Sequence, residues 1–294
     1  MPCGGPEALR IEVQARLMSW IGTLDLDYRL DDRGGTTALD RHEGPLRVLQ
    51  RLYPEGSGVC HHVLVHPPGG IVGGDQLSVE ARLAEGTHGL ITTPGATRFY
   101  RSAGALAVQQ LRARLEGGSR LEWLPLEAIA YDGALAENRM SFELAPGAEM
   151  MAWDLLALGL PAAGQAFARG GFLQQLELPG RWLERGRIDA SDTVLLNSPL
   201  GLAGHRVLGT FFFATGEPLA ARRRDQLLES ARDLLASDGL RASAGCTSPE
   251  PGLIVLRVLA PRVEPAMDLL KRVRAVWRQQ AWQMAPIAPR VWST

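Results

Sequence analysis

The sequence of 294 residues has few cysteines, little net charge and no long apolar run, and each shortage excludes a class of protein. Its cysteines, Cys3, Cys60 and Cys246, are odd in number, far apart and outside any C-x-x-C spacing, so neither a disulfide framework nor a zinc knuckle is expected. A net charge of −1 and a pI near 6.6 give no reason to expect a nucleic-acid partner. No apolar stretch approaches the length of a membrane span, so no membrane association is expected.

Common catalytic motifs are missing as well. The sequence holds no H-E-x-x-H, no G-x-S-x-G elbow and no Walker loop, and nothing in it suggests an activated nucleophile. Its start, MPCGGPEALRIEV, lacks an apolar core flanked by basic residues, which predicts a protein that stays in the cytoplasm. We therefore expect a soluble globular protein that is not an enzyme.

Short alternating apolar runs, broken by glycine and proline, predict β-strands over most of the chain. Near residue 217 the period becomes helical: apolar residues after Pro218 and again after Pro265 repeat every three or four positions. The pattern predicts a β body of about 10–215 and a C-terminal third of about 216–294 with helices at about 218–238 and 265–283. No linker divides the chain, so one domain of residues 1–294 is expected. The segment 150–160 is apolar enough for a buried strand or a short helix.

The stretch HPPGGIVGGDQL, from His66 to Leu77, has the most unusual composition in the chain. It lies between two alternating apolar runs and therefore joins strand to strand. Proline fixes φ and glycine tolerates positive φ, so the stretch is typical of a rigid corner, with positive φ expected at Gly73 and Gly74. The residues expected to build this corner are Pro67, Pro68, Gly69, Gly70, Gly73 and Gly74.

Candidate metal ligands lie just before this corner. Cys60, His61, His62 and His66 offer thiolate and imidazole, which late divalent metals prefer. On a strand, however, Cys60 and His62 point to one face and His61 to the other, so adjacency alone does not bring three ligands together. Structural histidines remain the alternative.

Six segments of the chain resemble, in order, the urease accessory protein family UreD, also called UreH. The resemblance implies a nickel-insertion chaperone with no permanent cofactor, which docks on urease apoprotein and recruits the scaffold UreF and the GTPase UreG. It also implies a fold of strands stacked in a helical array with two α-helices. The segments are GPLRVLQRLYPEG from Gly44, CHHVLVHPPGGIVGGDQL from Cys60, TTPGATRFYRS from Thr92, LEWLPLEAIAYDGA from Leu121, WDLLALG from Trp153 and the final PRVWST.

Members of that family are thought to carry an internal passage for nickel(II) in transit. Such a passage should offer weak contacts, because a complete cage of soft ligands would not release the ion. The alternative for each candidate is a buried ion pair or a loop-end hydrogen bond, and Asp75 with Arg98 could form such a pair. The residues expected along the path are Asp75, Asp154, Glu184, Cys60 and His61, with Arg98 as a further polar group, and the family-like loops also contain His66, Thr97 and Tyr100.

This chain departs from the family at two positions. Leu160 and Gln165 stand where the family usually has an arginine and a glutamate, and the joint loss of both charges is what a structural salt bridge would permit. Two other functions stay open at this point. One is a β-rich metal-dependent hydrolase with Cys60, His61, His66 and Asp75 as ligands, and the other is an assembly platform with no ion contact.

Overall fold

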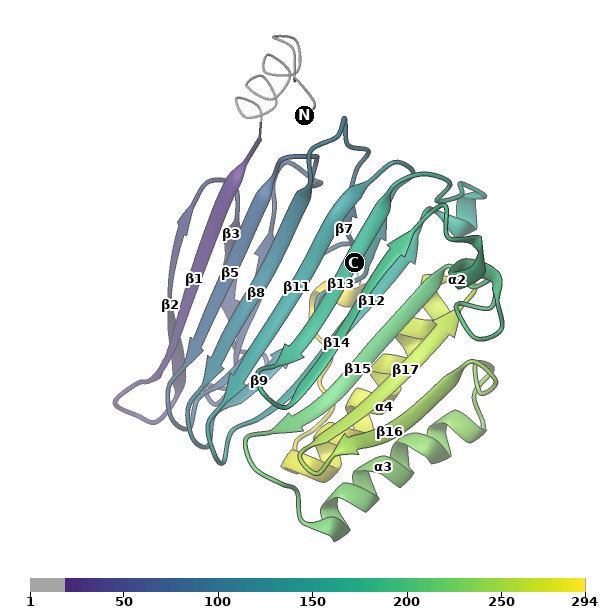
Figure 1. The fold of residues 1–294 in the computed structure, drawn as a ribbon. Helices are drawn as coiled ribbons and strands as arrows, with labels where there is room; N and C mark the ends of the chain where they lie inside the picture. The colour runs from purple at the N-terminus through teal and green to yellow at the C-terminus, as the bar shows by residue number, and fades with distance from the viewer. Residues whose placement is uncertain (1–18, 294) are drawn as a thin grey trace.

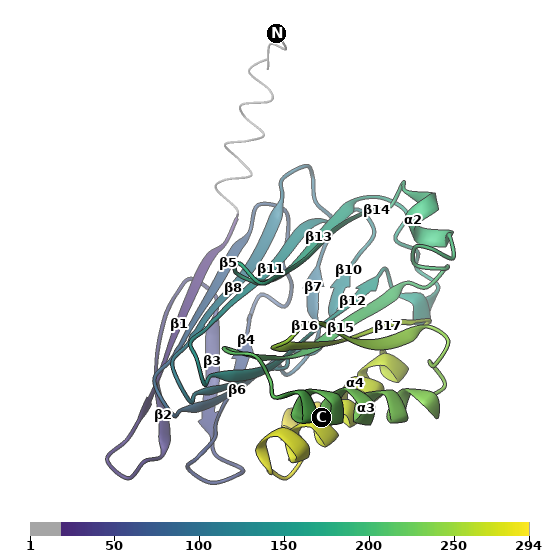
Figure 2. The same cartoon turned by 60° about the horizontal axis from the view of Figure 1, so that its bottom comes forward.

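The computed structural model describes residues 19–293, which form two facing β-sheets with two long helices packed outside the larger sheet (Figures 1 and 2). The smaller sheet has the order β14 (Trp182–Asp189), β13 (Gly171–Leu178), β11 (Leu135–Leu144), β8 (Ala107–Leu115), β5 (Gln76–Leu83), β1 (Ile21–Leu30) and β2 (Thr36–Glu43). The larger has the order β16 (Ala244–Glu250), β17 (Leu253–Ala260), β15 (Val207–Thr215), β12 (Glu149–Leu158), β9 (Arg120–Trp123), β6 (His88–Thr92), β4 (Cys60–Val65) and β3 (Arg47–Leu52), with β10 (Ala128–Ala130) and β7 (Thr97–Phe99) joined beside β12.

The chain winds from one sheet to the other, so that successive turns stack as a β-solenoid. Strands β5, β8, β11 and β13 are parallel neighbours on one side, and β4, β6, β9 and β12 are parallel neighbours on the other. A third, narrow side is formed by Ile71, β7 and β10, which pair in parallel and join β12. The expected helical array of strands is confirmed.

Side-chain alternation explains the core between the sheets. In β5, Leu77, Val79 and Leu83 are buried, while Glu80 between them is not. Strand β12 is buried on both faces, because Met150 points into the space between the sheets and Met151 packs on the helix side. This double burial explains why the segment 150–160 is continuously apolar, and it is a strand in the structure.

Helices α3 (Ala221–Ala236) and α4 (Val263–Trp282) confirm the two predicted helices to within a few residues. A five-residue helix, α2 (Thr193–Asn197), and the 3-10 turns Pro161–Ala163 and Arg290–Ser293 complete the helical segments that the structure describes. The part of the predicted β body at 10–18 lies outside the described residues. Within 19–293, none of the helices combines the length and apolarity needed to cross a membrane.

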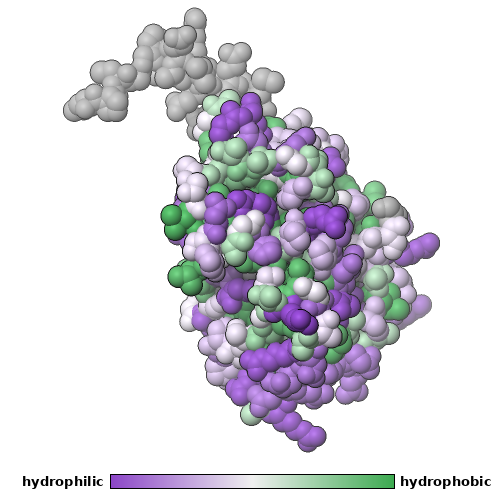
Figure 3. Space-filling model, turned by 90° about the vertical axis from the view of Figure 1, so that its right-hand side faces the viewer, coloured by the Kyte–Doolittle hydropathy of each residue, from purple (hydrophilic) through white to green (hydrophobic). Residues whose placement is uncertain are grey.

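The surface on the side of α2 and α3 is mainly polar, with small apolar patches between polar groups (Figure 3). Two of the exposed apolar residues, Val194 and Leu200, belong to α2 and the loop after it. The two clusters of buried apolar residues lie between the sheets and beneath α3 and α4.

Candidate functional site

The Asp75 side chain stabilises the corner loop before β5, which runs from His66 to Asp75. Its buried carboxylate accepts one hydrogen bond from the backbone N–H of Val72 at 2.9 Å and another from that of Trp20 at 2.7 Å. Trp20 immediately precedes β1, so one side chain fixes both the corner and the entry to the neighbouring strand. Arg98 is exposed on β7, and among residues 19–293 it forms no ion pair with Asp75. Asp75 thus makes loop-end hydrogen bonds, one of the two structural alternatives.

The two glycine pairs of the corner serve two different needs. Gly74 has φ +98°, a conformation that a side chain would strain. Gly70 has no such φ, but the ring of Tyr100 occupies the place where a Cβ would stand. The expectation of positive φ at Gly73 is wrong: this glycine is required because Ser102 and the backbone of Ala105 press against it.

The histidines of β4 have separate partners on opposite faces of the strand, as the alternation predicts. His61 Nε2 lies 2.8 Å from Glu55 on the helix side, whereas His62 Nδ1 lies 2.6 Å from the Tyr28 hydroxyl between the sheets. Burial lowers the pKa of His62 to about 4, so its ring is neutral near pH 7. Cys60 is buried in the core. No group of three His, Cys, Asp or Glu side chains within residues 19–293 is placed to hold a metal ion.

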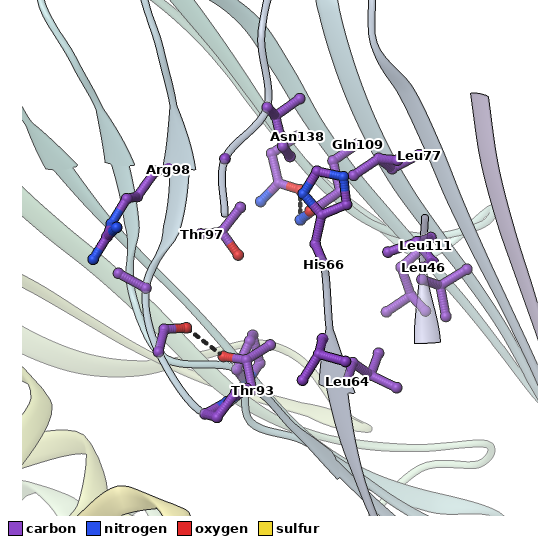
Figure 4. Close-up of a pocket in the computed structure, with 18 of the residues that line it drawn as sticks. Leu46, Leu64, His66, Leu77, Thr93, Thr97, Arg98, Gln109, Leu111 and Asn138 are labelled. Carbon is purple, nitrogen blue, oxygen red and sulfur yellow. Dashed lines mark hydrogen bonds between the residues drawn. The ribbon is translucent and has the colours of Figure 1, made fainter. Parts of the chain in front are cut away.

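A cavity of about 330 Å³ lies between the sheets under the corner loop. Figure 4 shows His66 pointing into it beside Gln109 and Asn138, with Thr97 and Thr93 across from the ring. Both ring nitrogens of His66 are buried without a hydrogen-bond partner. Burial lowers the pKa of His66 despite the opposing charge of Asp75. The wall also contains the apolar side chains Leu46, Leu64, Ile71, Leu77, Val79, Leu111, Trp123 and Met140.

Beyond the cavity a buried carboxylate stands among amides. Asp154 on β12 accepts hydrogen bonds from Gln174 Nε2 at 2.7 Å and from Asn138 Nδ2 at 3.4 Å, so its side chain points between the sheets. Burial raises the pKa of Asp154 to about 6, against the lowering effect of the hydrogen bond from Gln174. Asn138 in turn accepts a hydrogen bond from Gln109, which lines the cavity.

Further polar side chains, on the strands next to Asp154, extend from it to the open side of the solenoid. Asp154 stands opposite Thr210 on β15, and Thr210 opposite Arg257 on β17. Glu184 on β14 accepts a hydrogen bond from the Thr210 hydroxyl at 2.8 Å and another from Arg257 Nε at 2.7 Å. We call this set the polar row; it runs from the cavity to a partly exposed carboxylate and consists of Gln109, Asn138, Gln174, Asp154, Thr210, Glu184 and Arg257.

A second polar group, the ionic cluster, joins α4 to the larger sheet. Glu122 on β9 lies 2.6 Å from Arg274, 3.1 Å from Arg278 and 3.2 Å from His88. Arg278 also lies 2.6 Å from Glu55, which contacts His61. His61, one of the expected path residues, therefore belongs to a structural network.

Known proteins match this chain over almost its whole length. The family model described as UreD urease accessory protein matches residues 21–293. The chain belongs to the UreD family. It is 65% identical to the urease accessory protein UreD of Leptothrix cholodnii over 278 residues, which cover 94% of this chain and all of that protein. It is 60% identical to the UreD of Albidiferax ferrireducens over 276 residues, with the same coverage.

Leu160 and Gln165, the two positions expected from the resemblance to depart from the family, face each other in the fold. Leu160 and Gln165 flank the turn Pro161–Ala163 and exchange two backbone hydrogen bonds, Leu160 N–H to Gln165 O at 2.8 Å and Gln165 N–H to Leu160 O at 3.1 Å. An arginine and a glutamate at these positions would be neighbours, which fits a structural ion pair that was lost as a unit.

Sequence reasoning found two acids of the polar row, Asp154 and Glu184, but missed the groups around them. Asn138 and Gln174 each occupy a position where the strand's alternation calls for an apolar residue, for example between Ala136 and Met140. A polar residue on the otherwise apolar face of a strand is the sequence signal that could have identified Asn138 and Gln174. Thr210 shows the same signal.

Proposed function

We propose that this UreD-family protein is a non-catalytic chaperone of urease maturation in the cytoplasm, and that it conducts nickel(II) between its sheets along the polar row. In this proposal the chain docks on urease apoprotein and binds the UreF scaffold, through which the UreG GTPase joins the complex. The observation that carries the proposal is the buried carboxylate of Asp154, which has amide donors but no cationic partner among residues 19–293 and stands between the cavity and the partly exposed Glu184.

The chemistry of the row suits an ion that must move on. An isolated cation is costly to bury, so each stage of a path has to replace part of its hydration. Asp154 and Glu184 supply carboxylate oxygens, and Asn138, Gln174 and Thr210 supply neutral oxygens, none of which forms a cage of soft ligands. Weak oxygen contacts of this kind attract nickel without trapping it.

Three expected path residues have other partners, and for this reason the proposed path does not use them. Asp75 binds two backbone N–H groups, His61 contacts Glu55, and Cys60 is buried in the core. Glu184 is a residue of the proposed path and also one half of an ion pair, because Arg257 pairs with its carboxylate at the exposed end of the row. An arriving cation would have to compete with Arg257 there, which makes this position a candidate gate of the path.

Partner docking is supported by exposed apolar side chains at the end of the solenoid where β2 and β3 lie. Leu39, Leu49, Leu52 and Tyr53 are exposed there by 36 to 63% of their surface. Strand β3 is the last strand of its sheet at this end, so its outer edge is open to pairing. An edge with apolar side chains is the kind of surface that a partner chain covers.

The decisive experiment compares the nickel content of urease matured with Asp154→Ala and with the control Asp225→Ala, at matched amounts of assembled complex. Asp225 lies exposed on α3, far from the row in sequence and packing. We expect urease matured with Asp154→Ala to contain much less nickel, and the control to load it fully. If urease matured with Asp154→Ala contained its full amount of nickel and the complex still assembled, the nickel path would be excluded and only the role as an assembly platform would remain.

A further inference from the structure

The cavity under the corner loop has a chemistry that differs from the rest of the polar row. Its wall is mostly apolar and contains no acid, and its polar side chains include the His66 imidazole, the amides of Gln109, Gln110 and Asn138, and threonine hydroxyls. The backbone of Arg98 borders the cavity, but its guanidinium points away from His66 (Figure 4). A bare divalent cation gains little from such a wall, since apolar carbon does not replace lost water and no carboxylate of the wall balances its charge.

The volume of the cavity also exceeds what a single ion requires. About 330 Å³ is at the lower end of the range of small-molecule sites, about 300–1,000 Å³, and several times the roughly 30 Å³ share of one water molecule. The cavity can therefore hold an ion together with small ligands.

His66 supplies the one strong metal-binding atom of this wall. Both of its ring nitrogens are buried and unpartnered, and the ring points into the cavity (Figure 4). Buried polar groups in proteins are nearly always hydrogen-bonded or otherwise paired, so this imidazole is free to bind a molecule that enters the cavity. A neutral imidazole is a good ligand for nickel and offers a single position.

We propose that this cavity receives nickel as a neutral chelate with small amino-carboxylate ligands, and that His66 fills an open coordination position of that complex. The inference rests on the proposed nickel function and names the form in which the ion arrives. Two monoanionic ligands that bind through nitrogen and oxygen cancel the charge of nickel(II), and such donor sets suit its tetragonal geometry. The neutral complex meets the apolar wall at little electrostatic cost. Asn138 of the cavity wall donates a hydrogen bond to Asp154, which lies beyond the cavity.

The test uses the full-length chain in equilibrium dialysis with nickel bis-glycinate, in which the glycine is radiolabelled, and with nickel chloride in a non-coordinating buffer. We expect nickel and glycine to be retained together, with about two glycines for each nickel, and much weaker retention from chloride. His66→Leu should weaken chelate binding by about tenfold or more. The same substitution at the exposed His42 is the matched control and should change nothing.

A second variant tests the cavity without touching the imidazole. Met140→Trp should fill the space that its neighbours line and exclude the chelate while His66 remains. Equal binding of nickel from chloride with no retained glycine, unchanged chelate binding by His66→Leu, or no nickel binding in either form would each overturn the inference. The proposed nickel path is tested separately, by the nickel content of urease matured with Asp154→Ala, so that the two proposals can fail independently.

Discussion

The guanidinium of Arg274 lies 2.6 Å from the carboxylate of Glu122, with both side chains at most 2% exposed between helix α4 and strand β9. Burial alone would raise the pKa of Glu122, but Arg274, His88 and Arg278 outweigh it and hold that pKa well below the usual range. The carboxylate is therefore charged, and it is the central anion that holds α4 on the sheet.

Replacing Glu122 with Gln should strongly destabilise the protein. The substitution keeps the shape of the side chain but leaves two buried guanidinium groups without their shared anion, which costs about 3–5 kcal/mol for a buried pair. The exposed pair of Arg114 and Glu143 provides the control, and Glu143→Gln should change the free energy of unfolding by about 0.5 kcal/mol or less. Chemical denaturation of both variants measures the difference. Equal small effects would contradict the assigned role of Glu122.

Asp154 should make stability fall as pH rises from about 4 to about 6. Its folded pKa of about 6 lies above the value near 3.9 of an unfolded aspartate, so in this window the folded chain holds a proton that the unfolded chain has lost. Asp154→Asn removes this titration. The stability of the variant relative to wild type should therefore rise by about 1.4 kcal/mol per pH unit in the window and level off above it. Denaturation curves at several pH values measure this; a pH-independent difference would exclude the shifted pKa.

Asp75→Ala should reduce stability even if it has no effect on nickel. It leaves the backbone N–H groups of Val72 and Trp20 without acceptors in a partly buried place, at up to about 1–3 kcal/mol for each unsatisfied donor. Gly74→Ala should cost about 1–3 kcal/mol for a different reason, the strain of a side chain at φ +98°. The denaturation midpoints of the two variants test this. An Asp75→Ala chain as stable as wild type would return this residue to the list of path candidates.

Restoring the family's charges at Leu160 and Gln165 should be tolerated. Because the two residues pair directly across a turn, Leu160→Arg and Gln165→Glu should together be more stable than the sum of the single changes. The coupling in a double-mutant cycle should be about 0.2–1 kcal/mol, the range of exposed ion pairs. Zero coupling would mean that the new side chains do not meet.

Local patterns were sufficient to predict a mainly β body and the two long helices, because these depend on neighbouring residues. The alternation around Leu111 and Leu121 and the helical spacing of residues in α3 and α4 correspond to β8, β9 and the two helices. Helix α2 was not predicted, since five residues carry too little periodicity. The stacking order was expected only from the family resemblance, because the pairing of strands about 30 residues apart leaves no local trace.

The site was only partly predictable for the same reason. Asp154 was identified, but its donors Asn138 and Gln174 come from two other strands and meet it only after the sheets face each other. Glu122 was overlooked within LEWLP, although an acid in an otherwise apolar run is itself a sign of a buried partner. Its two arginine partners lie more than 150 positions later, beyond any spacing rule.

Glu55 and Arg278 are in contact although 223 positions separate them in the sequence. This contact can therefore form only late in synthesis. At the usual elongation rates of about 5–20 residues per second, roughly ten to forty-five seconds pass between the emergence of the two residues from the ribosome. During that interval the acid at position 55 has no arginine to neutralise it. Once β12, β15 and β17 have been made, the sheet surface later covered by α4 faces the surrounding solution. The nascent chain thus carries an uncovered apolar sheet surface from the formation of these strands until α4, the last long helix to be made, covers it.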